Sequence, residues 1–317
     1  MTQFNQAAFQ TANDLEENLA EYRVGSTTIG GATLFDLGIE HRGGLVAGEM
    51  LADVCLGAAA DVFAAAEPGA IGTGVVVKVA TDNPVGACLA CQYAGWPLSV
   101  GDYSAMVSGP IRLLRGKEQL LGKLGLSESG AIGVAVLEAD TYPTEAAVLK
   151  IAEECSIEPE LLTILIAPTT SIAGNIQVVA RSVETAMHKL HEVGFDVSDV
   201  LSATGSAPLP PPALKSIDGI GRTNDAILYG GSVTLFVDAD QSVIDEIGPK
   251  VPSNSSSDYG KTFGEIFASY EYDFFKVDPQ LFSPAVVTFV NLRSGISRTF
   301  GQLRPDILET SFGCKSQ

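Results

Sequence analysis

The sequence has few aromatic residues, few bases and no long apolar run. Aromatic residues make up 7% of the 317 residues and Trp occurs once, so a core must be built mainly from Ala, Val, Ile and Leu. Lys and Arg number 19 against 38 Asp and Glu, which gives a formal charge of −19. A surface this acidic repels phosphate backbones and anionic lipid heads, which disfavours nucleic acid and membrane partners.

Membrane and secretion signals are also missing. The longest uncharged stretches, 84–101 and 161–180, contain Pro, Gly and polar residues, so we expect neither to span a membrane. Residues 1–22 have neither a basic region nor an apolar one, and we expect no secretory signal there. Five thinly spread cysteines are typical of reduced thiols rather than of a disulfide framework. We therefore expect a cytoplasmic protein.

What is present favours a large folded protein. Hydrophobic residues make up 46% of the chain, and 33 Gly and 16 Pro indicate many turns. Helical and strand patterns alternate in both halves, which predicts a mixed α and β fold (class α+β) of two subdomains with a cleft between them. We place an N-terminal subdomain at 1–145 and a C-terminal one at 146–317, with interleaving left open.

Hydrophobic periodicity and turn residues predict the individual elements. Helices are expected over 4–22, 43–66, 143–155 and 175–193. Strands are expected over 26–36 (a pair broken by glycines), 74–80, 131–137, 161–167, 227–237 (broken by two glycines) and 286–292. The patterns of 88–96 and 110–124 are ambiguous.

The helix expected over 175–193 carries a polar stripe opposite its apolar face. At about 100° per residue the stripe contains Gln177, Arg181, Glu184, His188 and His191. One interpretation is a solvated face with an Arg–Glu pair worth about 0.2–0.5 kcal/mol. The other is a catalytic face, because a small polar loop at 168–175 precedes the helix and two of only three histidines lie on the stripe.

Two cysteines and two histidines have the residue types of a zinc site. Cys88-x-x-Cys91 and His188-x-x-His191 together would give a Cys₂His₂ set. The chain has no second C-x-x-C, and the two pairs lie about a hundred residues apart. Buried thiols and surface histidines are the simpler interpretation.

Two other segments are candidates for ligand binding. Residues 108–123 gather four bases, which favours either a local anion site, with Gly109 allowing close approach, or a helix with solvated bases. Residues 221–225 (GRTND) are expected as a loop before a strand, which either holds a ligand through backbone N–H groups and Asn224 or forms an Asx turn. No phosphate-binding loop, G-x-S-x-G or spaced metal carboxylates occur, which argues against nucleotide and serine-hydrolase mechanisms.

Motif-like segments recur nearly from end to end of the chain. They are Asn83-Pro84, 91–96, Ser108-Gly109-Pro110, 167–174, 177–181, Glu184, Lys189, 194–196, 205–208, 221–230, 281–285, 303–306 and Ser311-Phe312. Together these segments resemble the methenyltetrahydromethanopterin cyclohydrolase family, most closely its bacterial, methylotroph-type members.

The resemblance implies a function and a site. It implies a hydrolase that opens the cyclic amidine C–N bond of N5,N10-methenyl-tetrahydromethanopterin with water, giving N5-formyl-tetrahydromethanopterin in formaldehyde oxidation. It implies a homotrimer and no metal, nucleotide or redox cofactor. The family's R-x-x-E motif falls on Arg181 and Glu184, which we assign as orienting cation and general base. The implied substrate-binding residues are Asn83, Ser108, Gly109, Arg112, Thr204, Gly205, Arg222, Thr223 and Asn224.

Two alternatives stay open at this point. The chain could be a pterin-binding homologue without activity, although its intact R-x-x-E motif argues against that. It could also be a zinc-dependent hydrolase that uses Cys88, Cys91, His188 and His191. The roles of His188, His191 and the basic stretch 112–123 are not assigned.

Overall fold

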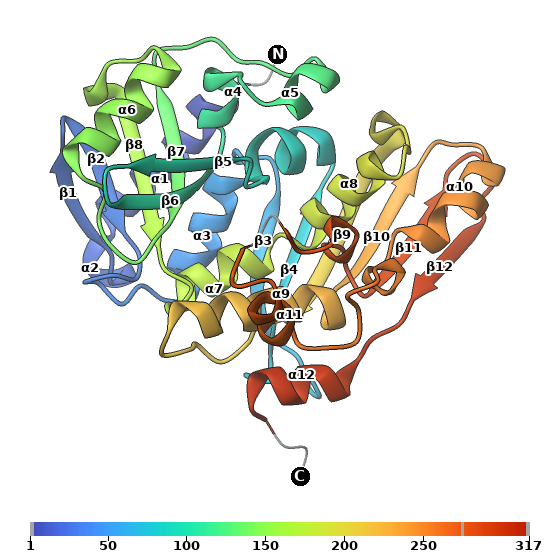
Figure 1. Cartoon of the computed structure of the whole chain (residues 1–317). Coiled ribbons are helices and arrows are strands. Elements are labelled where there is room, and N and C mark those ends of the chain that lie inside the picture. The colour runs from blue at the N-terminus through green and yellow to red at the C-terminus, as the bar shows by residue number, and fades with distance from the viewer. Residues whose placement is uncertain (1–2, 274–275, 315–317) are drawn as a thin grey trace. The chain divides into compact units, whose positions relative to one another are not determined.

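The chain groups into two compact units, each with one six-stranded sheet. The computed structural model describes residues 3–273 and 276–314 (Figure 1). Unit 1 comprises Met1–Asp61 and Gly86–Gln177, and unit 2 comprises Val62–Val85 and Val178–Gln317. Helices and strands mix in both, which confirms the predicted mixed α and β class. Residue 145, the expected boundary, lies inside unit 1 in this grouping; two subdomains with a cleft stay a prediction.

The sheet of unit 1 is parallel at its centre and antiparallel at its sides. Strands β2, β8 and β7 are parallel, and β1, β6 and β5 continue the sheet antiparallel in the order β1-β2-β8-β7-β6-β5. The predicted hairpin at 26–36 is present, and Gly30 and Gly31 turn it with φ of +56° and +93°. The strands are β1 (Gly25–Ile29), β2 (Ala32–Asp36), β5 (Trp96–Val100), β6 (Tyr103–Ser108), β7 (Gly133–Glu138) and β8 (Leu162–Ala167).

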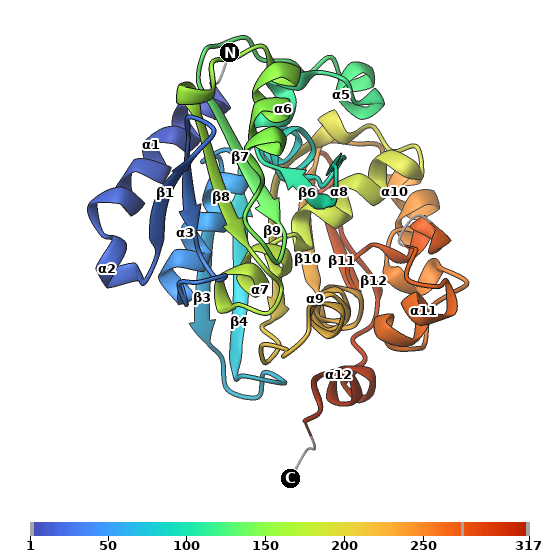
Figure 2. The same cartoon turned by 60° about the vertical axis from the view of Figure 1, so that its left-hand side comes forward.

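Helices cover both faces of this sheet. Along β8, Ile164 and Ile166 pack into the core beneath α6, whereas Leu165 and Ala167 pack into the core beneath α1 and α3. Figure 2 accordingly shows α1 and α6 on opposite sides of the strands. The helices are α1 (Phe4–Glu17), α2 (Leu19–Tyr22), α3 (Leu45–Cys55), the π-helix η1 (Val85–Gln92), α4 (Ile111–Arg115), α5 (Gln119–Leu124), α6 (Glu145–Cys155), η2 (Pro159–Leu161) and α7 (Ile172–Val179).

The sheet of unit 2 is mostly antiparallel, in the order β12-β11-β10-β9-β4-β3. Only β10 and β11 are recorded as a parallel pair among its described pairings. The strands are β3 (Asp61–Ala66), β4 (Val75–Thr81), β9 (Val200–Pro208), β10 (Ser232–Val237), β11 (Val286–Asn291) and β12 (Ser297–Gly301).

Helices of unit 2 pack on the sheet and on each other. Helix α8 contacts β9 and β10, helix α9 contacts β9, and α11 and α12 pack on α9. The elements are α8 (Ser182–Glu192), η3 (Val197–Asp199), α9 (Ser216–Gly230), α10 (Gln241–Ile247), η4 (Gly248–Lys250), η5 (Ser253–Ser255), α11 (Phe263–Ser269), η7 (Pro279–Leu281) and α12 (Pro305–Phe312). No helix in the described part of the chain has the length and apolar character needed to cross a bilayer.

Three predicted elements are wrong in part. The Ala-rich segment 61–66 forms strand β3, not a helix, because it hydrogen-bonds to β4 as the last strand of its sheet. The helix expected over 175–193 is two helices, α7 and α8, separated at Ala180 and Arg181. Residues 221–230, expected as a loop and the start of a strand, belong to α9, whose buried side packs against α11 and α12.

Candidate active site

Arg181 and Glu184 lie at the start of α8, where the chain leaves α7. The Arg181 backbone has φ −77° and ψ 6°, and its N–H donates to the Val178 carbonyl at 3.0 Å. The Arg181 carbonyl in turn accepts from the Thr185 N–H at 2.9 Å, which begins the new helix. The two charged side chains are thus one turn apart, and Nη1 of Arg181 lies 3.8 Å from Oε2 of Glu184.

Both charged side chains are shielded from water. Arg181 is 9% exposed and Glu184 is 4% exposed. The interpretation of a solvated helix face is therefore wrong for this pair. Burying two charges costs several kcal/mol per ion, by order of magnitude, so a buried pair is weak evidence for stability. Burial together with the R-x-x-E spacing makes this pair a candidate for function.

The rest of the predicted stripe is divided by the helix break. Gln177 lies in α7 of unit 1, where its Nε2 donates to Sγ of Cys55 at 3.2 Å. His188 and His191 lie on α8 and are partly exposed, and Nε2 of His188 lies 4.0 Å from a carboxylate oxygen of Glu192. The stripe therefore keeps only its α8 members on one helix.

Three other predicted site residues lie on or beside strands β4 and β9 of unit 2. Asn83 follows β4 and is exposed, and its backbone N–H donates to Oγ1 of Thr81 at 3.0 Å. Thr204 is exposed on β9, and its hydroxyl donates to the Val79 carbonyl at 2.9 Å. Gly205, the next residue of β9, is buried.

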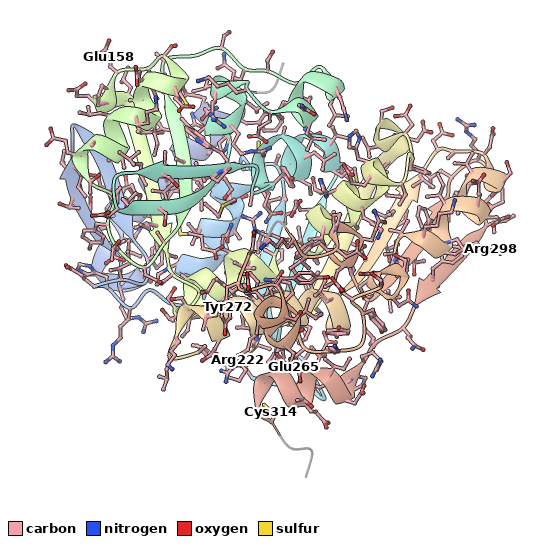
Figure 3. The ribbon with its side chains drawn as sticks, viewed as in Figure 1. Glu158, Arg222, Glu265, Tyr272, Arg298 and Cys314 are labelled. Atoms are coloured by element: carbon pink, nitrogen blue, oxygen red, sulfur yellow. The ribbon has the colours of Figure 1, made fainter. Side chains whose placement is uncertain are left out.

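Arg222, Thr223 and Asn224 lie within helix α9, so the expected loop is wrong. The side chains of Thr223 and Asn224 donate to carbonyls of the preceding turn at 2.9 and 2.8 Å. Arg222, labelled in Figure 3, donates to the Pro211 carbonyl at 3.0 Å. Backbone N–H groups inside a helix bond to the preceding turn, which removes them as ligand donors.

Ser108 and Gly109 belong to the packed interior of unit 1. The Ser108 hydroxyl lies 3.3 Å from Sγ of Cys55 and 3.5 Å from the Val136 carbonyl. Gly109 has a φ of +91°, and a Cβ there would lie 3.3 Å from the Val134 carbonyl oxygen. Glycine is therefore required at 109 by both the backbone conformation and the close approach of β7.

Arg112 is completely buried in unit 1. Its Nε donates to Glu118 at 2.8 Å, and a second guanidinium nitrogen forms an ion pair with the same carboxylate. The remaining nitrogen donates to three carbonyls of η1 at 3.1–3.2 Å. These contacts hold the guanidinium inside the protein. Arg112 is therefore neither a solvated base nor part of an open anion site, the two alternatives that the sequence left.

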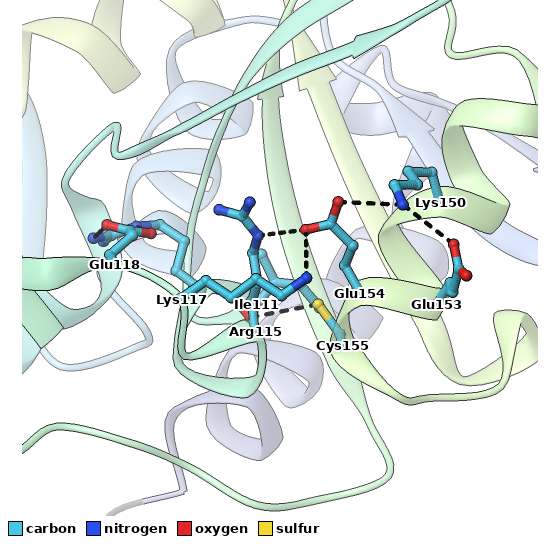
Figure 4. A network of polar contacts seen from close by, with 9 residues as sticks. Ile111, Arg115, Lys117, Glu118, Lys150, Glu153, Glu154 and Cys155 are labelled. Carbon is cyan, nitrogen blue, oxygen red and sulfur yellow. Dashed lines mark hydrogen bonds and ion pairs between the residues drawn. The ribbon is translucent and has the colours of Figure 1, made fainter. Parts of the chain in front are cut away.

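Other bases of the stretch 112–123 form a network with α6. Arg115 and Lys117 contact the Glu154 carboxylate at 2.7 and 3.3 Å, and Lys150 approaches it at 3.6 Å (Figure 4). The Arg115 guanidinium also lies 4.2 Å from the centre of the Trp96 ring. This part of the basic stretch therefore joins α4, α6 and β5.

The cysteine and histidine pairs of the zinc alternative lie in different units. Cys88 and Cys91 are fully buried in η1, whereas His188 and His191 lie on α8. Over residues 3–273 and 276–314, no group of three or more His, Cys, Asp or Glu side chains could hold a metal ion. Nothing in this range gathers the ligands that the zinc alternative requires.

Comparison with known proteins identifies the family. A family model described as Cyclohydrolase (MCH) matches residues 3–312. A methenyltetrahydromethanopterin cyclohydrolase from Rhodopirellula baltica is 53% identical over 291 residues, which cover 90% of this chain and 87% of the relative. The chain belongs to the methenyltetrahydromethanopterin cyclohydrolase family.

Relatives of this family occur in bacteria and archaea. The cyclohydrolase from Methylobacterium organophilum is 44% identical over 291 residues, covering 90% of each chain. The one from Methanosarcina barkeri is 42% identical over 290 residues, again covering 90% of each chain. The cyclohydrolase family that the sequence motifs indicated is therefore confirmed.

Sequence reasoning missed one buried acid within the 221–230 motif of this cyclohydrolase. Asp225 on α9 is 1% exposed and accepts from the Phe263 N–H, at the start of α11, at 2.7 Å. Burial raises the pKa of Asp225 to about 7, although hydrogen bonds from Ser311 and Phe263 lower it in part. The polar GRTND run gave no signal of burial, because only the helical phase of α9 turns this one carboxyl inward.

This acid predicts a pH-dependent stability. Because the folded pKa of about 7 exceeds the ordinary 3.8, the folded state gains a proton-linked stabilisation that is complete below about pH 4 and is lost as the pH rises through 7. The pKa shift sets an upper bound of about 4 kcal/mol on this contribution to the free energy of unfolding. Asp225→Asn should remove this dependence, so urea unfolding should show wild type losing stability between pH 5 and pH 8 and the variant losing less.

Asp218→Asn is the matched control, because Asp218 is exposed on the same helix. It should follow wild type at both pH values. Equal pH dependence in wild type and Asp225→Asn would show that Asp225 is not the titrating group.

Proposed function

We propose that this chain catalyses the reaction of its family, with Glu184 as general base and Arg181 orienting the Glu184 carboxylate. The substrate is N5,N10-methenyl-tetrahydromethanopterin, which water opens to the N5-formyl product. The observation that supports the assignment is the buried Arg181–Glu184 pair at the first turn of α8. Family membership supports the substrate, and the buried pair supports the roles of the two residues.

The chemistry requires a group that takes a proton from water. The methenyl carbon is electrophilic because its positive charge is shared by two nitrogens. As the water oxygen bonds to that carbon, the Glu184 carboxylate takes one water proton. Glu184 then passes this proton to N10 as the bond between N10 and the carbon breaks, and the remaining hydroxyl proton is released to solvent as the formyl C=O forms. A positioned base of this kind contributes about 10²–10⁴-fold in rate.

Arg181 balances the charge of the Glu184 carboxylate in this mechanism. Attack by water discharges the methenyl cation, so an isolated carboxylate beside it would stabilise the ground state more than the transition state. A guanidinium 3.8 Å from the carboxylate offsets that attraction and restricts the orientation of the base. We therefore assign Arg181 to positioning and charge balance.

Residues of unit 2 are the better candidates for contacts with the substrate. Asn83, Thr204 and Arg222 keep exposed or partly exposed side chains, and we propose them as pterin contacts. Thr223 is 0% exposed, and Ser108 and Arg112 are buried in unit 1, so we leave these three out. The homotrimer stays a prediction that sedimentation measurements can test.

Arg181→Ala tests the proposed role of the guanidinium. We expect kcat to fall by about tenfold or more because the carboxylate loses its orientation, and KM not to rise, because the unbalanced carboxylate attracts the cationic substrate more strongly. The loss of methenyl absorbance after mixing enzyme and substrate measures both. Arg298→Ala, which removes an exposed Arg on β12, should leave both constants unchanged.

If Arg181→Ala has a lower free energy of unfolding but a normal kcat, the Arg181–Glu184 pair has a structural role and no catalytic one. Wild-type protein that leaves the methenyl absorbance unchanged would contradict the proposed activity itself and favour the inactive pterin-binding alternative.

A further inference from the structure

Gly205 on β9 lies against the first turn of α8, at the two residues between Arg181 and Glu184. Gly205 is buried on β9, a strand inside the sheet, where it pairs with Val233 of β10 and Val79 of β4. Glycine in the middle of a central strand weakens the strand, and it often marks a place where another part of the chain approaches closely.

The approaching group is the residue that follows Arg181. A Cβ on Gly205 would lie 2.6 Å from Oγ of Ser182 and 2.9 Å from Cγ2 of Val183. Both distances are shorter than Cβ atoms tolerate in real proteins, so a side chain at 205 requires a shift of the Ser182 and Val183 side chains, of the helix or of the strand. Ser182 is itself completely buried, so its side chain has little room to move away from a Cβ at position 205.

Ser182 and Val183 are the two residues between Arg181 and Glu184. The height of this turn above β9 therefore sets the position of both charged side chains at once. We infer that Gly205 is a positioning residue for the reaction: its missing side chain lets the first turn of α8 lie against β9 with the Arg181–Glu184 pair in place. This inference rests on the proposed function, and it replaces a direct substrate contact for Gly205.

Gly205→Ala is the test. It should lower kcat by about 10–100-fold in folded protein while KM changes less than about threefold, because a displacement near 1 Å costs this much in a positioned reaction. Gly264→Ala is the matched control, because a Cβ at Gly264 of α11 meets nothing within 4 Å. It should leave kcat and KM unchanged.

A double variant distinguishes a positioning role of Gly205 from a general loss of structure. Removing Oγ from the other side of the contact, in Ser182→Ala/Gly205→Ala, should recover several-fold of the kcat that Gly205→Ala loses. If Gly205→Ala does not fold, Ser182→Cys places a larger atom at the same contact and should lower kcat in the same direction.

Three results would overturn the inference: full kcat in Gly205→Ala, a raised KM with intact kcat, or no recovery in the double variant. Glu184→Gln keeps the two proposals distinct. If Glu184→Gln is inactive and Gly205→Ala keeps full kcat, only the positioning role fails. If Glu184→Gln keeps full kcat, the catalytic assignment fails regardless of Gly205.

Discussion

Replacing Glu184 with Gln is expected to lower kcat by about 10²–10⁴-fold, the usual contribution of a positioned general base. An amide has nearly the size and shape of the carboxylate but cannot accept the water proton at neutral pH. The loss should therefore appear in kcat, with the protein folded. Single-turnover decay of the methenyl absorbance measures it without interference from product release.

Glu192→Gln gives the matched control for this variant. Glu192 is exposed at the far end of the same helix, so its replacement should leave turnover unchanged. Near-normal turnover in folded Glu184→Gln would show that another group takes the proton, and the proposed mechanism would then be wrong.

Arg112→Ala should cause the largest loss of stability, about 3–5 kcal/mol, as expected when one partner of a buried ion pair is removed. The Glu118 side chain is only 9% exposed, and it would lose the guanidinium that pairs with it. The carbonyls of Leu89, Ala90 and Cys91 would lose their side-chain donor as well. Urea unfolding of the purified variant measures the change.

Lys123→Ala is the control for Arg112, because Lys123 is an exposed base of the same stretch and should change stability by less than about 0.5 kcal/mol. Glu118→Gln extends the test if Arg112→Ala does not fold. It should be destabilised with an unchanged KM. Wild-type stability together with a raised KM in either variant would return Arg112 to the anion-binding role that the sequence suggested.

The fold could be predicted where the local pattern and the tertiary structure agree. Strands β4, β8 and β11 are short, apolar and bounded by turn residues, and all three were expected within one or two residues of their ends. The Ala-rich composition of 61–66 predicts a helix. The segment forms strand β3 instead, because helix propensity is weak compared with the gain from pairing beside β4.

Helix α9 shows the opposite error. Its glycines and polar residues are typical of a loop, and Gly costs about 1 kcal/mol in a helix interior relative to Ala. Burial of Gly219, Thr223, Ala226 and Tyr229 against neighbouring elements outweighs that cost. Only the tertiary packing shows this, which is why the local sequence predicts a loop there, either ligand-binding or an Asx turn.

The R-x-x-E spacing predicts that Arg181 and Glu184 lie one helical turn apart, and the structure places them so at the start of α8, with Arg181 as the N-cap residue. Their catalytic roles stay a proposal, and their surroundings could not be predicted from the sequence. The break before Arg181 contains neither Gly nor Pro, and apolar periodicity continues across it, so no sequence signal marked it. The contact between Ser182 and Gly205 depends on strand β9, which comes later in the chain, and the local sequence gives no signal that the pair is buried.

The kcat of the double variant Arg181→Ala/Glu184→Gln tests directly whether Arg181 acts through Glu184. If the guanidinium acts through the carboxylate, its removal costs nothing further once the base is gone, since residues that act as a unit have non-additive effects. We expect a kcat no more than about threefold below that of Glu184→Gln alone. A loss equal to the product of the two single losses would show that Arg181 and Glu184 act independently, and the proposed positioning role of Arg181 would then be wrong.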